Sequence, residues 1–193
     1  ASCRKMVEDC VKQMGRVDIL VNNAGINIRK RPELYTFKEW REVLSINLDG
    51  AFVCSHAVQP HMKKQGGGKI INIGSVQCEL ARPGIAPYTA SKGAVLAMTR
   101  EIAAIYARKG VRANALCPGP VMTPLLAKFL SDDAKRERRL VHIPMGRFGE
   151  PHEIVNGALF LASNESSWMT GQSLIIDGGI TSAYVTPEGP AWS

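Results

Sequence analysis

Ser75, Tyr88 and Lys92 combine the residue types and spacing that proton transfer needs. Tyr88 and Lys92 are four residues apart, so on a helix they lie on one face. A phenol with a pKa of about 10 is a poor acid–base catalyst at neutral pH, but a neighbouring ammonium group stabilises the phenolate and lowers that pKa. Ser75 precedes Tyr88 by 13 residues, and its hydroxyl is suited to holding a carbonyl oxygen. These residues predict a site for acid–base chemistry.

Apolar strands alternate with helices along the chain, and they must position these side chains. Apolar runs rich in β-branched residues predict buried strands at 17–21, 69–74, 111–117 and 173–177. Apolar periodicity and capping signals predict helices at 2–14, 36–64, 88–109 and 151–162. This alternation is typical of an α/β protein whose parallel sheet is covered by helices on both faces. No composition break divides the 193 residues, so we expect a single domain.

Polar and glycine-bearing segments follow three of the predicted strands. Asn22-Asn23-Ala24-Gly25 follows the first strand, Gly74-Ser75 the second and Pro118-Gly119-Pro120 the third. Because the carboxyl ends of parallel strands share one edge, where ligands bind, we expect these segments to converge near Tyr88 and Lys92. Structural alternatives remain for two of them, since Ser75 can cap a loop and Pro118-Gly119 can be a turn alone.

Five sequence elements in this order resemble the short-chain dehydrogenase/reductase family. They are Asn22-Asn23-Ala24-Gly25, Asn47 within Ser-Ile-Asn-Leu, Ser75, the Tyr88-x-x-x-Lys92 pair and Pro118-Gly119. A lone Tyr-x-x-x-Lys occurs by chance in many helices, whereas the ordered set with its Ser-to-Tyr gap is specific. The resemblance runs from residue 1 to about residue 180. It implies a Rossmann-like, doubly wound parallel sheet.

The resemblance also implies an activity and catalytic roles. The protein is expected to be an NAD(P)-dependent oxidoreductase that interconverts a secondary alcohol and a ketone by hydride transfer. Tyr88 exchanges the proton with the substrate, Lys92 lowers the pKa of Tyr88 and binds the nicotinamide ribose, and Ser75 positions the substrate oxygen. Asn47 holds a water that links Lys92 to solvent. The alternative is that the Asn47 side chain only satisfies the hydrogen bonds of backbone groups.

The resemblance further implies the residues that contact NAD or NADP. They are Asn22, Asn23, Ala24, Gly25, Tyr88, Lys92, Pro118, Gly119, Val121 and Thr123. Residues 22–25 lie beside the adenosine part, and Val121 and Thr123 match positions that meet the carboxamide. For Val121 a place in the core is the alternative.

A closer similarity, to the gluconate 5-dehydrogenase-like branch, surrounds the site. It is carried by Ser75-Val76-Gln77-Cys78-Glu79-Leu80-Ala81-Arg82-Pro83, by Ile85-Ala86-Pro87-Tyr88 and by an arginine soon after Gly25. The substrate is then expected to be a sugar acid or polyol contacted by Ser75, Gln77 and Tyr88. Arg29, or as second choice Arg31, is suited to bind a carboxylate through a bidentate pair.

The Gly-rich turn Thr-Gly-x-x-x-Gly-x-Gly that opens the family's fold is absent from the 193 residues, as are its first strands. We therefore expect an N-terminally incomplete domain over 1–193, taken from a longer protein, with a substrate lid at 121–149. A genuine truncation that binds cofactor poorly is the alternative. The residue that separates NAD from NADP is also absent, so both cofactors stay open. The family resemblance implies a homotetramer, and a non-catalytic oligomerisation subunit is the alternative function.

Composition excludes several other classes of protein. The chain is 45% apolar and 21% charged, with no apolar run long enough for a membrane helix, and it is expected to be cytoplasmic. Five scattered cysteines and four histidines without ligand spacing indicate free thiols and no metal site. The net charge of +7 is concentrated in residues 1–123, but the short Arg29-Lys30-Arg31 cluster lies in no nucleic-acid motif. A solvated loop or an acid-binding corner of a pocket explains that cluster better, so no nucleic-acid partner is expected.

Overall fold

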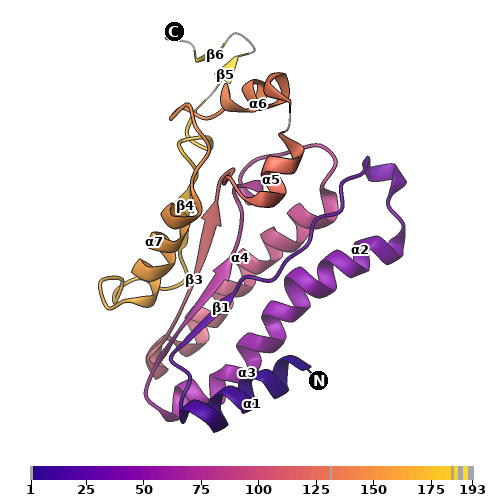
Figure 1. Cartoon of the computed structure of the whole chain (residues 1–193). Helices are drawn as coiled ribbons and strands as arrows, with labels where there is room; N and C mark the ends of the chain where they lie inside the picture. Colours follow the sequence, from indigo (N-terminus) through magenta and orange to yellow (C-terminus); the bar gives the residue numbers. More distant parts are fainter. Residues whose placement is uncertain (1, 131, 184, 187–188, 191–193) are drawn as a thin grey trace.

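A parallel four-stranded sheet forms the centre of the computed structural model, which describes residues 2–130, 132–183, 185–186 and 189–190 (Figure 1). The strands lie in the order β1-β2-β3-β4. Their bounds are β1 Ile19–Asn22, β2 Gly68–Ile73, β3 Val111–Pro118 and β4 Ser173–Ile176. All three strand pairings are parallel, with Asn22 opposite Asn72 and Ile71 opposite Asn114. The predicted parallel α/β fold is therefore confirmed.

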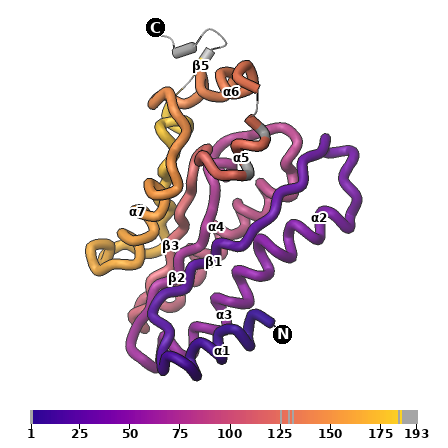
Figure 2. The backbone as a smooth tube through the Cα atoms, viewed as in Figure 1, coloured from indigo at the N-terminus to yellow at the C-terminus, as the bar shows by residue number. Residues whose placement is uncertain are grey.

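Helices cover both faces of the sheet, as Figures 1 and 2 show, with α3 and α4 on one face and α7 on the other. The α-helices are α1 Ser2–Met14, α2 Phe37–Leu44, α3 Gly50–Lys64, α4 Ala86–Tyr106, α5 Pro124–Phe129, α6 Asp133–Leu140 and α7 Pro151–Ala162. Short 3-10 turns occupy Pro32–Leu34, Val76–Cys78 and Ala107–Lys109, and a π-helical turn occupies Ser45–Asp49. Two short strands, β5 Val185–Thr186 and β6 Gly189–Pro190, pair with each other. Among the described residues, no helix is long and apolar enough to cross a membrane.

Alternation along β2 divides the core between the two faces. Successive strand side chains point to opposite faces, so Ile70 and Ile71 enter different clusters. Ile70 packs with Met62 of α3 and Ile102 of α4, whereas Ile71 packs with Leu161 of α7. A sheet buried on both faces explains why its strands read as continuous apolar runs.

The helix predictions for 2–14 and 151–162 match α1 and α7 to the residue, while the other elements differ at their ends. The first strand begins at Ile19 and not at Val17, because its parallel register with β2 starts at the Ile19–Lys69 pair. The helix predicted for 36–64 is interrupted by the π-helical turn. In the described part of the chain, β1 pairs only with β2, and its apolar Ile19 and Val21 are exposed.

A buried polar network fastens β1 and β2 to the helices behind them. Asn22 Nδ2 donates to Asn72 Oδ1 at 2.8 Å and to Ser55 Oγ on α3 at 3.0 Å. Asn72 Nδ2 in turn donates to Thr99 Oγ1 on α4 at 2.8 Å. Asn72, Ser55 and Thr99 are buried, so each of these groups needs its partner in place of water.

We expect Asn72→Ala to lower the free energy of unfolding by about 1–3 kcal/mol, because it removes two buried hydrogen bonds, one from Asn22 Nδ2 and one to Thr99 Oγ1. Urea unfolding followed by circular dichroism measures the change. Asn27→Ala, at an exposed loop position, is the matched control and is expected to have little effect. Equal stability of the two variants would contradict a structural role for the network.

Candidate active site

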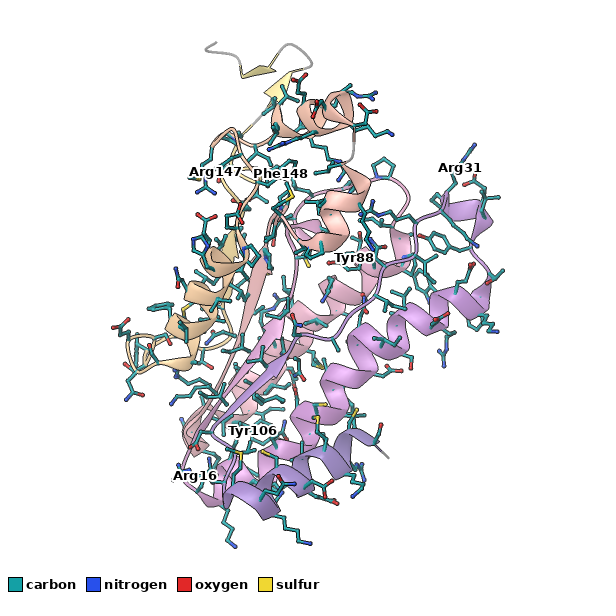
Figure 3. The ribbon with its side chains drawn as sticks, viewed as in Figure 1. Arg16, Arg31, Tyr88, Tyr106, Arg147 and Phe148 are labelled. Atoms are coloured by element: carbon teal, nitrogen blue, oxygen red, sulfur yellow. The ribbon has the colours of Figure 1, made fainter. Side chains whose placement is uncertain are left out.

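A pocket of about 200 Å³ lies at the carboxyl edge of the sheet. Its lining residues come from the ends of the strands and the start of α4: Asn23, Gly25, Ile73, Gly74, Ser75, Tyr88, Lys92, Pro118 and Gly119. The segments that sequence spacing predicts to converge thus meet around one space, which we call the strand-end pocket. Figure 3 places Tyr88 below α5 at this edge, with Tyr106 at the other end of α4.

Not every residue implied by the family resemblance lines this pocket. Asn22 directs its amide into the network with Asn72. Val121 forms an isolated β-bridge with Gly149. Thr123 caps α5, since its Oγ1 accepts from Leu126 N at 3.2 Å. Ala24, Asn47, Gln77 and Arg29 also lie outside its lining.

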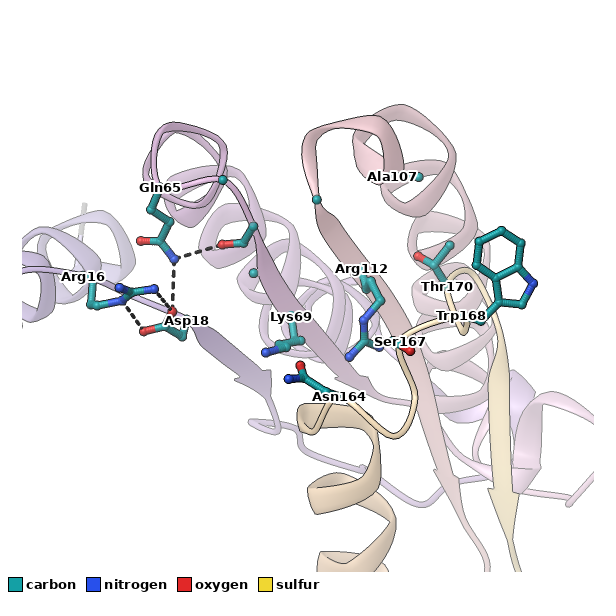
Figure 4. Close-up of a pocket in the computed structure, with 14 residues that line it drawn as sticks. Arg16, Asp18, Gln65, Lys69, Ala107, Arg112, Asn164, Ser167, Trp168 and Thr170 are labelled. Atoms are coloured by element: carbon teal, nitrogen blue, oxygen red, sulfur yellow. Dashed lines mark hydrogen bonds and ion pairs between the residues drawn. The ribbon is translucent and has the colours of Figure 1, made fainter.

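A larger cavity of about 650 Å³ lies at the opposite, amino edge of the sheet (Figure 4). Three of its charged side chains are engaged in holding the fold. Arg16 pairs with Asp18, and Arg112 donates to the carbonyls of Leu161 in the last turn of α7 and of Ser163 and Met169 after it. None of the predicted catalytic residues lines it, so we place the candidate active site at the strand-end pocket.

Ser75 joins β2 to the 3-10 turn Val76–Cys78. Its Oγ accepts from Gln77 N at 3.2 Å, so the loop-capping alternative is realised in the structure. That bond uses an oxygen lone pair and leaves the hydroxyl proton for another acceptor. Ser75 also hydrogen bonds Tyr88, which favours the phenolate and lowers the pKa of Tyr88. Capping and catalysis are therefore compatible for this hydroxyl.

The pKa of Tyr88 differs from the sequence-based expectation. Burial raises the pKa of Tyr88 above its usual value of 10.0, because the low-dielectric surroundings disfavour the phenolate more than Ser75 stabilises it. The Lys92 Nζ lies 5.8 Å from the Tyr88 ring centroid and donates to Ile73 O at 2.6 Å. Burial also lowers the pKa of Lys92. The expected lowering of the pKa of Tyr88 by Lys92 is thus wrong for this structure, and Tyr88 is a neutral phenol at pH 7.

Asn47 lies in the π-helical turn between α2 and α3 and is buried. Its Oδ1 accepts from Ile26 N at 2.8 Å, and its Nδ2 donates to Ile26 O and to Ser91 Oγ, each at 3.0 Å. Ser91 Oγ donates onward to Tyr88 O at 2.7 Å. Asn47 therefore satisfies backbone groups, as its structural alternative states, and also connects the loop after β1 to the turn that carries Tyr88.

Ser91 is a positioning residue that the sequence interpretation missed. It is fully buried and links Asn47 to the backbone of Tyr88. Its place three residues after Tyr88 on the predicted helix was the available signal, because a helical serine hydroxyl can donate to the carbonyl three or four residues before it. Only the packing of the π-helical turn against α4 identifies its partner.

The pocket has space and donors for the nicotinamide half of a dinucleotide. A Cβ on Gly25 would lie 3.3 Å from Asn47 Oδ1 and 3.6 Å from Lys92 Nζ, so the glycine keeps open the space beside the ammonium group. Lys92 has three N–H donors, and its hydrogen bond to Ile73 O uses one. Two donors therefore remain for hydroxyl groups such as those of a ribose. The residues that line the strand-end pocket therefore fit the nicotinamide half of a dinucleotide.

Gln77 carries a polar atom that the described residues do not satisfy. Its Oε1 is buried and has no hydrogen-bond partner among them. Leaving such an acceptor unpaired costs about 1–3 kcal/mol. Gln77 lies two residues after Ser75, in the 3-10 turn Val76–Cys78 and outside the lining of the strand-end pocket.

Comparison with known proteins identifies relatives along nearly the whole chain. A family model described as enoyl-(acyl carrier protein) reductase matches residues 1–181. A gluconate 5-dehydrogenase of Gluconobacter oxydans is 45% identical over 170 residues, which are 88% of this chain and 66% of that protein. A 3-oxoacyl-[acyl-carrier-protein] reductase of Thermotoga maritima is 42% identical over 182 residues, 92% of this chain and 71% of that protein.

A solved structure extends the similarity to three dimensions. The gluconate 5-dehydrogenase from Burkholderia cenocepacia, crystallised in complex with NADP and tartrate, superposes with a TM-score of 0.89 at 45% identity. The match covers 94% of this chain and 71% of that one. The chain thus spans about two thirds of the length of the relatives it matches.

Removal of the Ser75 hydroxyl is expected to raise the pKa of Tyr88 further, because Ser75→Ala removes a hydrogen bond that favours the phenolate. Ultraviolet titration of tyrosinate absorbance measures this shift, and subtraction of the Tyr88→Phe titration isolates the Tyr88 signal. A midpoint that stays unchanged or falls would show that Ser75 does not stabilise the phenolate.

Proposed function

The chain belongs to the short-chain dehydrogenase/reductase family, in its gluconate 5-dehydrogenase-like branch, and on that premise we propose that it is an NAD(P)-dependent oxidoreductase interconverting a secondary alcohol and a ketone. The observation that supports this most directly is the meeting of Ser75, Tyr88 and Lys92 around the strand-end pocket. A hydroxyl, a phenol and an ammonium group there supply an oxygen-binding group, an acid–base group and a donor for the cofactor.

In the proposed mechanism, Tyr88 Oη gives its proton to the carbonyl oxygen during reduction and removes the hydroxyl proton during oxidation. Ser75 donates a hydrogen bond to the same oxygen. When bound, NAD(P) supplies or accepts the hydride. Because burial keeps Tyr88 protonated at neutral pH, Tyr88 is in the form that ketone reduction needs. Oxidation needs the phenolate, so its rate is expected to rise toward alkaline pH.

The chain's own residues divide between cofactor and substrate in this proposal. Lys92 holds the ribose hydroxyls with the donors that Ile73 leaves, Pro118 and Gly119 border the nicotinamide end, and Asn23 and Gly25 border the side toward the adenosine part. The other residues proposed along the cofactor are Asn22, Ala24, Val121 and Thr123. Asn47 orients the turn that carries Tyr88 through its hydrogen bond to Ser91. It also holds the water that links Lys92 to solvent, using hydrogen-bonding capacity that its contacts with Ile26 and Ser91 leave free.

We propose a sugar acid or polyol as the substrate. The unpaired Gln77 Oε1 supports a ligand that carries hydroxyl groups, because such a hydroxyl satisfies a buried acceptor. Arg29 is proposed to bind the carboxylate of an acid. Two relatives support this class by name, since both are gluconate 5-dehydrogenases.

We further propose a cytoplasmic homotetramer with the two long helices at one interface. Exposed Phe52 on α3 and Ile105 on α4 support an interface there, because large apolar side chains in water are stabilised by burial. The segment 121–149 is proposed as the substrate lid. A non-catalytic subunit would need no such meeting of Ser75, Tyr88 and Lys92, so we do not favour it.

Tyr88→Phe is expected to lower kcat about 10²- to 10⁴-fold, because it removes the acid–base hydroxyl and keeps the ring. Nicotinamide absorbance at 340 nm, with the full-length protein and 5-keto-D-gluconate, measures turnover. Tyr106→Phe, at the far end of α4, is the matched control and is expected to keep wild-type activity. Retained turnover in Tyr88→Phe would remove Tyr88 from the mechanism.

Arg29→Ala is expected to raise KM for an acid substrate about tenfold or more, because a charge-assisted hydrogen bond is lost. Arg31→Ala is the control, since Arg31 already pairs with Glu33 at 2.6 Å. Steady-state kinetics with 5-keto-D-gluconate separate KM from kcat. If only Arg31→Ala raises KM, the carboxylate is assigned to the wrong arginine.

A further inference from the structure

The loop between β1 and α2 and the loop before α4 meet at the carbonyl group of Gly84. Lys30 N donates to Gly84 O at 3.1 Å, and Tyr35 Oη lies 3.1 Å from the same oxygen. Tyr35 Oη also lies 2.6 Å from Ile28 O and accepts from Lys30 N at 3.3 Å. The phenol has one proton to share between the two carbonyl oxygens, so a single hydroxyl group joins the two loops. We call Ile28, Lys30, Tyr35 and Gly84 the loop junction.

Gly84 has a backbone conformation that suits this junction. Its φ of +84° lies in the left-handed region, which glycine adopts without steric cost. A Cβ at this position would lie 3.4 Å from Lys30 O, so the two loops pass in close backbone contact. The two backbones therefore meet in one defined arrangement.

The Lys30 side chain anchors the junction to α2. Lys30 Nζ pairs with Glu39. Glu39 also accepts from Thr36 N at 3.0 Å, and its own N–H donates to Thr36 Oγ1 at 3.2 Å, which forms the capping box of α2. The hydrogen bond from Lys30 lowers the pKa of Glu39 to about 2, so the carboxylate is charged at neutral pH. One side of the junction is therefore held by a helix.

The other side of the junction leads directly into the turn that carries Tyr88. Gly84 precedes Ile85, the N-cap residue of α4, which makes no side-chain cap hydrogen bond. A helix start without such a cap depends on its packing and on the chain that precedes it. Ile85 is buried and supplies the packing, and Gly84 supplies the hydrogen bonds. Tyr88 is the third residue of α4, so its position follows the position of that start.

Other contacts hold the cofactor side of the site. Asn47 bonds to both the N–H and the carbonyl of Ile26, and Lys92 donates to Ile73 O. None of these residues belongs to the loop junction, and Tyr35 lies outside the lining of the strand-end pocket. Loss of the junction is therefore expected to disturb the first turn of α4 and to leave the cofactor contacts in place.

We propose that Tyr35 is a positioning residue for the proton-transfer step. Its hydroxyl holds Gly84 against the loop between β1 and α2, and thereby fixes the first turn of α4, which carries Tyr88. This inference rests on the proposed function, in which Tyr88 and Ser75 must reach the same substrate oxygen. Tyr35 itself touches neither substrate nor cofactor. Ser91 holds the same turn from the side of the π-helical turn, so the turn has two separate attachments.

Tyr35→Phe removes the hydroxyl and keeps the ring. In the full-length enzyme it is expected to lower the single-turnover rate of ketone reduction about tenfold, because a misplacement of about 1 Å can cost up to about 10²-fold. The dissociation constant of the reduced nicotinamide cofactor should stay unchanged. Stopped-flow absorbance at 340 nm with saturating 5-keto-D-gluconate measures the rate, and quenching of protein fluorescence measures cofactor binding. Tyr106→Phe, at the far end of α4, is the matched control and should keep the wild-type rate.

Lys30→Met tests the anchor on α2 and leaves Tyr35 in place. It removes the ion pair with Glu39 and keeps the backbone donor to Gly84. A loss of rate in the same direction, about two- to threefold, is expected, because a partly exposed ion pair contributes little. Lys38→Met, at an exposed position of α2, is the matched control and should have the wild-type rate. Wild-type rates in both Tyr35→Phe and Lys30→Met would overturn the inference.

The titration of Tyr88 gives a readout that a merely structural role would not change. Burial raises the pKa of Tyr88 and outweighs the hydrogen bond from Ser75. When the first turn of α4 is released, water reaches the phenol, so Tyr35→Phe is expected to lower the pKa of Tyr88 toward 10.0. The difference between the ultraviolet titrations of Tyr35→Phe and of Tyr35→Phe/Tyr88→Phe isolates this signal.

Thermal unfolding separates positioning from stability. The Tm of Tyr35→Phe is expected to fall by no more than about 4 °C, because Lys30 N still donates to Gly84 O. A lower Tm with a wild-type rate and an unchanged pKa of Tyr88 would show a merely structural role and overturn the inference. Weaker cofactor binding that accounts for the whole loss of rate would also overturn it, since the effect would then lie on the cofactor side.

The two proposals fail in different ways. If Tyr88→Phe is inactive but Tyr35→Phe keeps both the wild-type rate and the wild-type pKa of Tyr88, only the role given to Tyr35 is wrong. If Tyr88→Phe keeps its turnover, the proposed acid–base mechanism is wrong, whereas a lowered pKa of Tyr88 in Tyr35→Phe still shows that the loop junction holds the start of α4.

Discussion

The hydrogen bond between Lys92 and the Ile73 carbonyl is the constraint on which the site depends. Lys92 is only 4% exposed, so its ammonium group needs a strong acceptor, and Ile73 O supplies one at 2.6 Å. This bond fastens α4 to the end of β2, the strand that leads directly into Ser75. The chain from Asn47 through Ser91 to the Tyr88 carbonyl adds the loop after β1. Three segments distant in sequence are thereby held in one geometry.

Burial gives the site its chemical character. It keeps Tyr88 protonated at neutral pH and leaves Gln77 Oε1 without a partner among the described residues. The unpaired acceptor is unfavourable for the folded chain alone, and a ligand that supplies a hydroxyl group would relieve that cost. Structures commonly retain such local costs where they bind or react, because selection acts on the liganded state.

Much of the fold was predictable because its signals are local. Apolar periodicity and caps located α1 and α7 to the residue, and β-branched runs located the strands to within one or two residues. The π-helical turn at Ser45–Asp49 carries no comparable signal, since it depends on Asn47 bonding to Ile26 across the packed interior. The position of β1's start depended on its partner strand, which local propensity does not encode.

Residue types and spacing by themselves determined the parallel α/β fold, the meeting of Ser75, Tyr88 and Lys92 at one sheet edge, and the family. The fold and this meeting follow from strand direction and helical repeat, which are properties of neighbouring residues, and the family follows from the order of its motifs. Only the tertiary structure decided the direction of the pKa shift of Tyr88, the linking role of Ser91 and the burial of Gln77 Oε1 without a partner among the described residues. The reason is physical: desolvation and Coulomb interactions depend on distance through space, and distant chain segments set that distance only when they pack.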